Sequence, residues 1–161
     1  LFPVCSEGLY QEIASALNTQ TEKELEAKLK QSPQLLAQFP LITSYSMYES
    51  YAEDWRRWFA EEGQPLPEGA AFHRFSHLML AHEAATHSLG VALVNDYMFN
   101  ELDPKDGLVK LPCGTHTATD SFYIAYKHSR RHEPALKQLR HWLRSELNEL
   151  SLPSHKKIVS G

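Results

Sequence analysis

The sequence has only two cysteines, Cys5 and Cys113, among 161 residues. A mixed domain of this size buries enough apolar surface without a disulfide, and no export signal is evident, so both thiols are predicted to be reduced and buried. The sequence also lacks an apolar stretch approaching the roughly 20 residues that cross a bilayer. These absences predict a cytoplasmic protein without a membrane partner.

An excess of positive charge is missing as well. Sixteen Lys and Arg residues stand against twenty Asp and Glu residues, for a formal net charge of -4. A surface that binds DNA phosphates by itself needs the opposite balance. With 42% hydrophobic residues, 7 Gly and 9 Pro, the composition instead predicts a globular domain that does not hold DNA on its own.

Motifs for catalysis are absent from the sequence. It has no Gly-x-Ser-x-Gly elbow, no phosphate-binding glycine loop and no dinucleotide fingerprint. Ser76 and His77 do not suit a hydrolase, because neighbouring helical positions point about 100° apart and no orienting carboxylate is evident. The sequence therefore predicts a protein that is not an enzyme.

Nine histidines raise the question of a metal site. His82 and His87 are five positions apart, which on a helix leaves their rings about 140° apart rather than on one face. His73 precedes the predicted start of that helix, so it does not share a face with His77. We therefore expect no metal site and no cofactor.

Strand and helix signals alternate along the chain. Predicted strands cover residues 1–6, 41–44, 69–74, 91–94, 108–111 and 122–126. Predicted helices begin at Ser6, Thr21, Ser32, Ser50, Ser76 and Pro134, with a further short helix near residues 97–102. This alternation favours an α/β fold with a mixed, mostly parallel sheet flanked by helices.

The stretch 75–93 is the most informative part of the sequence. It predicts a helix capped by Ser76, a stop at Gly90 in a left-handed turn, and a buried strand at 91–94. One helical face carries Leu78, Ala81, Ala85 and Leu89. The start of such a helix directs free amides and partial positive charge at the rim of a cleft, which suits a carboxylate or another small anion.

This stretch resembles the effector-binding domain of LysR-type transcriptional regulators, in the branch that includes the glycine-cleavage activator and the β-lactamase regulators. Further matching segments follow in the same order: residues 1–6, 32–36, 40–42, 54–55, 107–111, 122–126 and 134–146. The resemblance implies a type 2 periplasmic-binding-protein-like fold. Residues 1–121 are then the second effector-binding lobe, 122–150 a crossover strand and C-terminal helix of the first lobe, and 151–161 a tail. The DNA-binding domain and most of the first lobe are expected to lie outside this chain.

The resemblance also implies a site, partners and a function. It places polar residues of the Ser76 turn in an effector cleft, namely Ser76 and His77, with further lining from Thr43, Ser44 and Tyr123. The expected partners are a small-molecule effector and a second copy of the chain in a homodimer or higher oligomer, with DNA bound only through the absent domain. The predicted function is the ligand-sensing regulatory domain of a transcription factor.

Two other functions remain open at this point. A solute-binding lobe of a transport system shares the two-lobed architecture, and an α/β enzyme shares the alternating pattern. The predicted helix from Pro134 carries a long apolar stripe, made of Leu136, Leu139, Leu143, Leu147 and Leu150. We expect another chain or a rearranged neighbour to cover that stripe.

Overall fold

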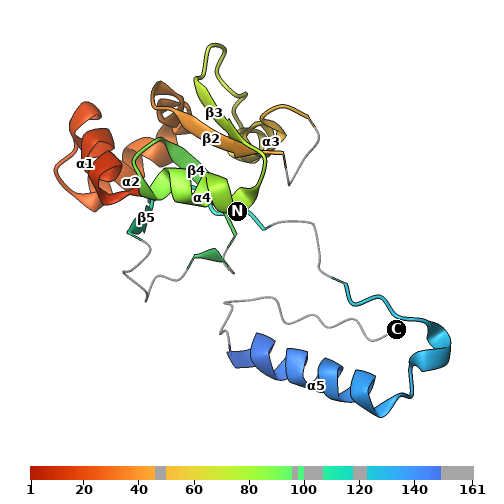
Figure 1. Ribbon diagram of the computed structural model, residues 1–161. Helices are drawn as coiled ribbons and strands as arrows, with labels where there is room; N and C mark the ends of the chain where they lie inside the picture. Colours follow the sequence, from red (N-terminus) through yellow and green to blue (C-terminus); the bar gives the residue numbers. More distant parts are fainter. Residues whose placement is uncertain (46–49, 96–97, 100–106, 118–122, 150–161) are drawn as a thin grey trace. The chain divides into compact units, whose positions relative to one another are not determined.

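The computed structural model describes residues 1–45, 50–95, 98–99, 107–117 and 123–149. The chain divides into two compact units, Leu1–Ala118 and Thr119–Gly161, which are described separately. Figure 1 shows the helices and strands of each. No helix within the described ranges has the length and apolar character needed to span a bilayer.

The first unit is built on a five-stranded sheet with the order β3-β2-β4-β1-β5. Its strands are β1 (Phe2–Ser6), β2 (Leu41–Ser44), β3 (Phe72–Phe75), β4 (Val91–Val94) and β5 (Leu108–Lys110). β2 pairs in parallel with β3 and β4, whereas β1 runs antiparallel to both β4 and β5. Four strands therefore share one direction, and the predicted mixed, mostly parallel sheet is confirmed.

Helices cover both faces of the sheet. One face packs against α1 (Glu7–Ala16), α2 (Glu22–Gln31), a 3-10 helix η1 (Pro33–Gln38) and α3 (Glu53–Glu61), with the fully buried Trp55 and Phe59 at the centre. The other face packs against α4 (Leu78–Thr86) through Ala81, Ala84 and Ala85. Figure 1 shows α4 crossing in front of the strands.

The first two helices begin where the sequence predicts. The Ser6 hydroxyl accepts a hydrogen bond from the Leu9 amide at 3.2 Å. The Thr21 hydroxyl accepts one from the Glu24 amide at 3.3 Å, and the Glu24 carboxylate accepts one from the Gln20 amide at 2.7 Å. The two hydroxyls thus satisfy amides of the first helical turn, and the Glu24 carboxylate binds the amide of the residue just before the N-cap.

The predicted cap of α3 is wrong. The residue before the helix is Ala52, in the left-handed conformation with φ 51°, and no side chain caps it. The Asp54 carboxylate instead accepts a hydrogen bond from the Trp55 amide at 2.9 Å. An acidic side chain in the first turn thus takes the place of the cap predicted at Ser50.

Two details around α4 also differ from the prediction. The helix begins at Leu78 with His77 as its N-cap, so Ser76 is not the capping residue. The left-handed turn after the helix is made by Ser88, with φ 60°. Gly90 is needed for a different reason: a Cβ there would lie 2.4 Å from the Pro40 carbonyl oxygen, so β2 and the end of this turn pack too closely for a side chain.

Both cysteines are free and buried, as predicted. Desolvation by burial raises the pKa of Cys5 and of Cys113 to about 12. A thiol with so high a pKa carries almost no thiolate near neutral pH, so both side chains are unreactive components of the core.

The second unit contains α5 (Pro134–Glu149), which confirms the predicted helix. The predicted crossover strand at 122–126 stays a prediction: Phe122 lies outside the described residues, and residues 123–126 are not assigned to a strand within the second unit. A strand needs a neighbour that accepts and donates its backbone hydrogen bonds, and aromatic composition alone does not supply one. The helix predicted near 97–102 falls mostly outside the described residues.

The apolar stripe of α5 is largely open within the second unit. Leu139, Trp142 and Leu147 are 44%, 55% and 56% exposed. Leu136 and Leu143 are half-buried, and Leu150 lies outside the described residues. What covers this stripe stays a prediction, as do the proposed lobe boundaries at 121 and 150.

Candidate functional site

Three parallel strands end side by side on the first unit. β2 ends at Ser44 and is followed by Tyr45, β3 ends at Phe75, and β4 is followed by Asn95. Ser44 lies opposite Phe75 in the strand register, and the Tyr45 amide donates to the Phe75 carbonyl at 3.1 Å. We call the ends of β2, β3 and β4 the carboxyl edge. Ligands of open α/β sheets bind outside the carboxyl ends of the strands, so this edge is the candidate site.

Ser76 and His77 lie together at the carboxyl edge, between β3 and α4. Both are exposed, and the Ser76 hydroxyl lies 2.8 Å from Nδ1 of His77. No side chain caps the nine-residue helix α4. The two predicted residues therefore present polar atoms at the positive end of a helix, an arrangement that favours an anionic group.

Thr43 and Ser44, at the end of β2, are buried. Their exposed fractions are 3% and 6%. The Thr43 hydroxyl donates a hydrogen bond to the Asp54 carboxylate at 2.7 Å. Thr43 is therefore engaged with α3 and supports the end of β2 from beneath, so a direct contact between its side chain and a ligand would require this bond to break.

Asp54 is the residue at this edge whose role the sequence did not reveal. Its side chain is 4% exposed and receives hydrogen bonds from Thr43 and from the Trp55 amide. Burial raises the pKa of Asp54, and these hydrogen bonds to the carboxylate oppose that rise. The indole Nε1 of Trp55 also donates to the Ile42 carbonyl at 2.8 Å. Together, Asp54 and Trp55 fasten the first turn of α3 to β2.

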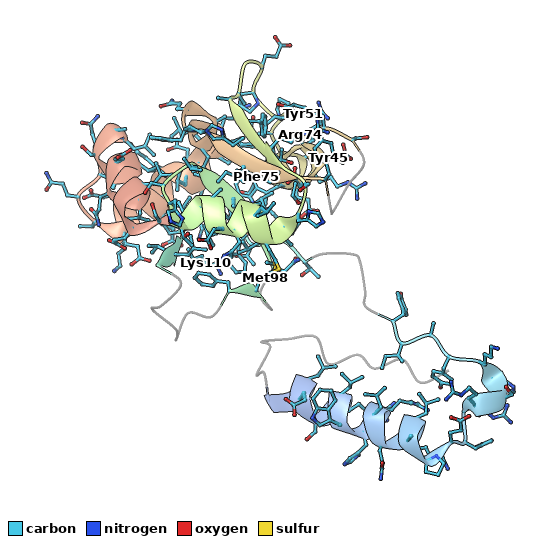
Figure 2. The ribbon with its side chains drawn as sticks, in the orientation of Figure 1. Tyr45, Tyr51, Arg74, Phe75, Met98 and Lys110 are labelled. Atoms are coloured by element: carbon cyan, nitrogen blue, oxygen red, sulfur yellow. The ribbon has the colours of Figure 1, made fainter. Side chains whose placement is uncertain are left out.

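A charged side chain that the sequence did not single out lies beside the same edge. The guanidinium carbon of Arg74 is 3.3 Å from the ring centroid of Tyr45 and 4.8 Å from that of Tyr51. Figure 2 shows these three side chains together. Residues so far apart in sequence give no periodic signal, so only the pairing of β2 with β3 reveals the cluster.

Tyr123 was the remaining residue predicted to line the cleft. It belongs to the second unit, where its side chain is 87% exposed. Its predicted place in the cleft remains a prediction that rests on the resemblance alone.

The sequence predicted that the histidines do not form a metal site. Within the residues described, no three His, Cys, Asp or Glu side chains gather as ligands would. His87 instead interacts with its own helix, with Nδ1 2.9 Å from the Glu83 carbonyl. His116 lies near two carboxylates at the end of α3, 3.0 Å from Glu61 and in contact with Glu62.

A hollow of about 780 Å³ lies elsewhere, along β5. Its polar lining is dominated by acidic side chains of α1 and α2, with Lys30 and Lys110 also present. Its wall includes Phe99 and Gly107, on either side of residues 100–106, which are outside the described ranges. This hollow lies away from the ends of the three parallel strands, and its carboxylates would repel an anion. We therefore place the candidate site at the carboxyl edge.

Comparison with known proteins decides the family. The model of the LysR substrate binding domain matches residues 17–148, which is well over half of the chain. The chain belongs to the LysR substrate-binding domain family. The predicted resemblance is therefore confirmed, together with its α/β fold.

Solved members of this LysR family have similar structures. The AmpR effector binding domain from Citrobacter freundii is 27% identical, with a TM-score of 0.63 and 92% of this chain covered. A Citrobacter freundii effector binding domain with three substitutions is 28% identical, with a TM-score of 0.62 and 91% covered. The effector domain of the transcriptional regulator AmpR of Pseudomonas aeruginosa is 25% identical, with a TM-score of 0.61 and 92% covered.

This LysR-family chain spans less than two thirds of those solved domains. The matched share is 63% of each Citrobacter domain and 61% of the Pseudomonas domain. No curated protein sequence matches the chain significantly.

Proposed function

We propose that this chain is the ligand-sensing part of a LysR-type transcription regulator and that its carboxyl edge contacts a small effector. The observation that carries the proposal is the family match over residues 17–148, combined with the exposed Ser76 and His77 at the start of α4. The similar structures are effector-binding domains of a regulator, which favours sensing over solute transport.

The proposed mechanism is a change in population between two arrangements. An effector that binds one arrangement more tightly shifts the equilibrium toward it by its difference in affinity. Ser76 and His77 would hold an anionic group of the effector, and the family resemblance adds Tyr123 as a further contact. We further propose that the regulator acts in the cytoplasm as a homodimer or larger assembly and binds DNA through a domain beyond this chain.

Thermal unfolding in the presence of small carboxylates, the free amino acids among them, tests this proposal. A ligand present at 100 times its Kd stabilises the folded state by about 2.7 kcal/mol. We expect at least one such compound to raise the Tm, and the double substitution Ser76→Ala with His77→Ala to reduce that shift by removing its polar partners.

The other end of α4 offers a matched control. Thr86→Ala with His87→Ala removes a hydroxyl and an imidazole from the same helix, and their hydrogen bonds are local to its last turn. These control substitutions should leave the ligand-induced shift unchanged. A panel without any stabilising compound, or a shift that persists without Ser76 and His77, would contradict the proposed site.

A further inference from the structure

Arg74 is held in an unusual environment for an exposed arginine. It lies in β3, and its guanidinium carbon lies over two tyrosine rings, at 3.3 Å from the Tyr45 centroid and 4.8 Å from the Tyr51 centroid. A guanidinium over aromatic rings is attracted by their negative faces. Stacking on a ring uses a flat face of a guanidinium, so the N–H groups in its plane can bind another partner.

The backbone places this cluster beside the carboxyl edge. Arg74 pairs with Thr43 in the register of β3 and β2, and Tyr45 comes directly after the last residue of β2. Side chains alternate between the faces of a strand. Phe75 accordingly packs with the core on the α4 side, whereas Arg74 lies with Tyr51, which precedes α3. Figure 2 shows the cluster next to Phe75.

The rings themselves are supported but accessible. Tyr51 packs edge-on against Phe72, with ring centroids 5.5 Å apart. The exposed fractions of Tyr45 and Tyr51 are 48% and 44%. Tyr51 and Phe72 also line a hollow of about 530 Å³ beside the loop that leads into β3. A ligand can therefore reach the cluster from solvent.

The positive charge of Arg74 is not neutralised by a described neighbour. The ion pairs found in the described ranges involve other residues, and none joins a carboxylate to Arg74. Arg57 on α3, by contrast, pairs with the Glu53 carboxylate at 3.0 Å. Among the described residues, Arg74 thus combines contact with two rings and a charge without an ion-pair partner, which suits bidentate recognition of an oxyanion.

We propose that Arg74, oriented by Tyr45 and Tyr51, binds a carboxylate or phosphate group of the effector. The inference rests on the proposed sensing function and names the chemical class of the ligand, an anion with two oxygens that can accept parallel N–H bonds. Charge-assisted bidentate bonds of this kind are geometrically specific to arginine. Lysine at the same position would keep the positive charge but could not donate two parallel N–H bonds.

The experiment measures anion binding at the Arg74 guanidinium itself. The Nε–Hε signal of Arg74 is observed by nuclear magnetic resonance in the full chain, at constant ionic strength. Inorganic phosphate is added in one series and acetate in another. We expect this signal to move saturably with at least one anion, and Arg74→Lys to weaken the binding about tenfold or more, because the second hydrogen bond is lost.

Variants of the rings separate orientation from charge. Tyr45→Phe keeps the aromatic face and should bind the anion with the same Kd, whereas Tyr45→Leu should weaken binding several-fold. Lys23→Gln on α2 removes one positive charge from an exposed position and serves as the charge-matched control for Arg74→Gln. A tighter response to phosphate than to acetate would identify a phosphate-bearing effector, and the reverse order a carboxylate-bearing one.

Two results would overturn the proposal. One is an unchanged Kd in Arg74→Lys for both anions, or no saturable movement of the Arg74 signal. The other is an effector-induced Tm shift that needs Ser76 and His77 but survives Arg74→Gln; this result would leave the proposed sensing function in place and remove Arg74 from it. Conversely, anion binding at Arg74 without any stabilising effector would support the anion site and contradict the sensing function.

Discussion

Replacing Gly90 with alanine should destabilise the first unit strongly, because the backbone of β2 occupies the space where a Cβ would lie. The ideal Cβ position is 2.4 Å from the Pro40 carbonyl oxygen and 3.2 Å from Cγ1 of Ile42. Ordinary contacts of a Cβ begin near 3.4 Å, so the carbonyl must move by about 1 Å. That carbonyl accepts the Val91 amide at 2.9 Å, a link between β2 and β4.

The magnitude follows from three costs of the Gly90 substitution. Strain at φ 155°, where side chains are disfavoured, costs about 1 kcal/mol. Losing the hydrogen bond of Pro40 costs about 1 kcal/mol, and displacing buried backbone about as much again. We therefore expect the free energy of unfolding to fall by about 3 kcal/mol, or the Tm to fall by roughly 10 °C. Urea unfolding followed by circular dichroism measures it.

Two other glycines provide controls for this experiment. Gly69 has φ 83° but no atom within 4 Å of an added Cβ, so Gly69→Ala should cost only about 1 kcal/mol from strain. Gly8 lies within α1 with a single ordinary contact at 3.7 Å, so Gly8→Ala should stabilise by about 0.5–1 kcal/mol. A loss at Gly90 no larger than that at Gly69 would refute the steric argument.

Two further predictions concern buried side chains of the first unit. Because burial raises the pKa of Asp54, the folded state holds its proton more tightly than the unfolded state, and the wild-type free energy of unfolding falls as pH rises from about 3.8 through the raised pKa. Asp54→Asn has no carboxyl group to ionise, so the free energy of unfolding of the variant should rise relative to that of the wild type between pH 4 and 7, as measured by urea unfolding. A difference between the two proteins that does not change with pH would contradict this reasoning. Leu29 is a fully buried residue of α2, so Leu29→Ala should lower the free energy of unfolding by about 2–5 kcal/mol. Lys23→Ala at an exposed position of the same helix, unfolded in parallel, should change it little.

The candidate site was predicted in part because its signals are local. Ser76 and His77 lie next to a helix start that the sequence marks by apolar spacing, and the structure places both at the exposed carboxyl edge. The predicted caps Ser50 and Ser76 were wrong, because they rested on the propensity of serine for this position alone. The structure has Ala52 and His77 as the N-cap residues instead. Thr43 was predicted to line the cleft, and this stays a prediction; its side chain is buried and bonded to Asp54.

Local patterns in the sequence determined the α/β class, the first two helix caps and the helix from Pro134, because periodicity and capping act over only a few residues. Strand order was decided by tertiary structure, since β1 inserts between β4 and β5 through contacts about 90 and 105 residues away in the chain. The buried pairing of Thr43 with Asp54 and the stacking of Arg74 on two tyrosines arise in the same way. Such contacts depend on which strands become neighbours, and no short stretch of residues contains that information.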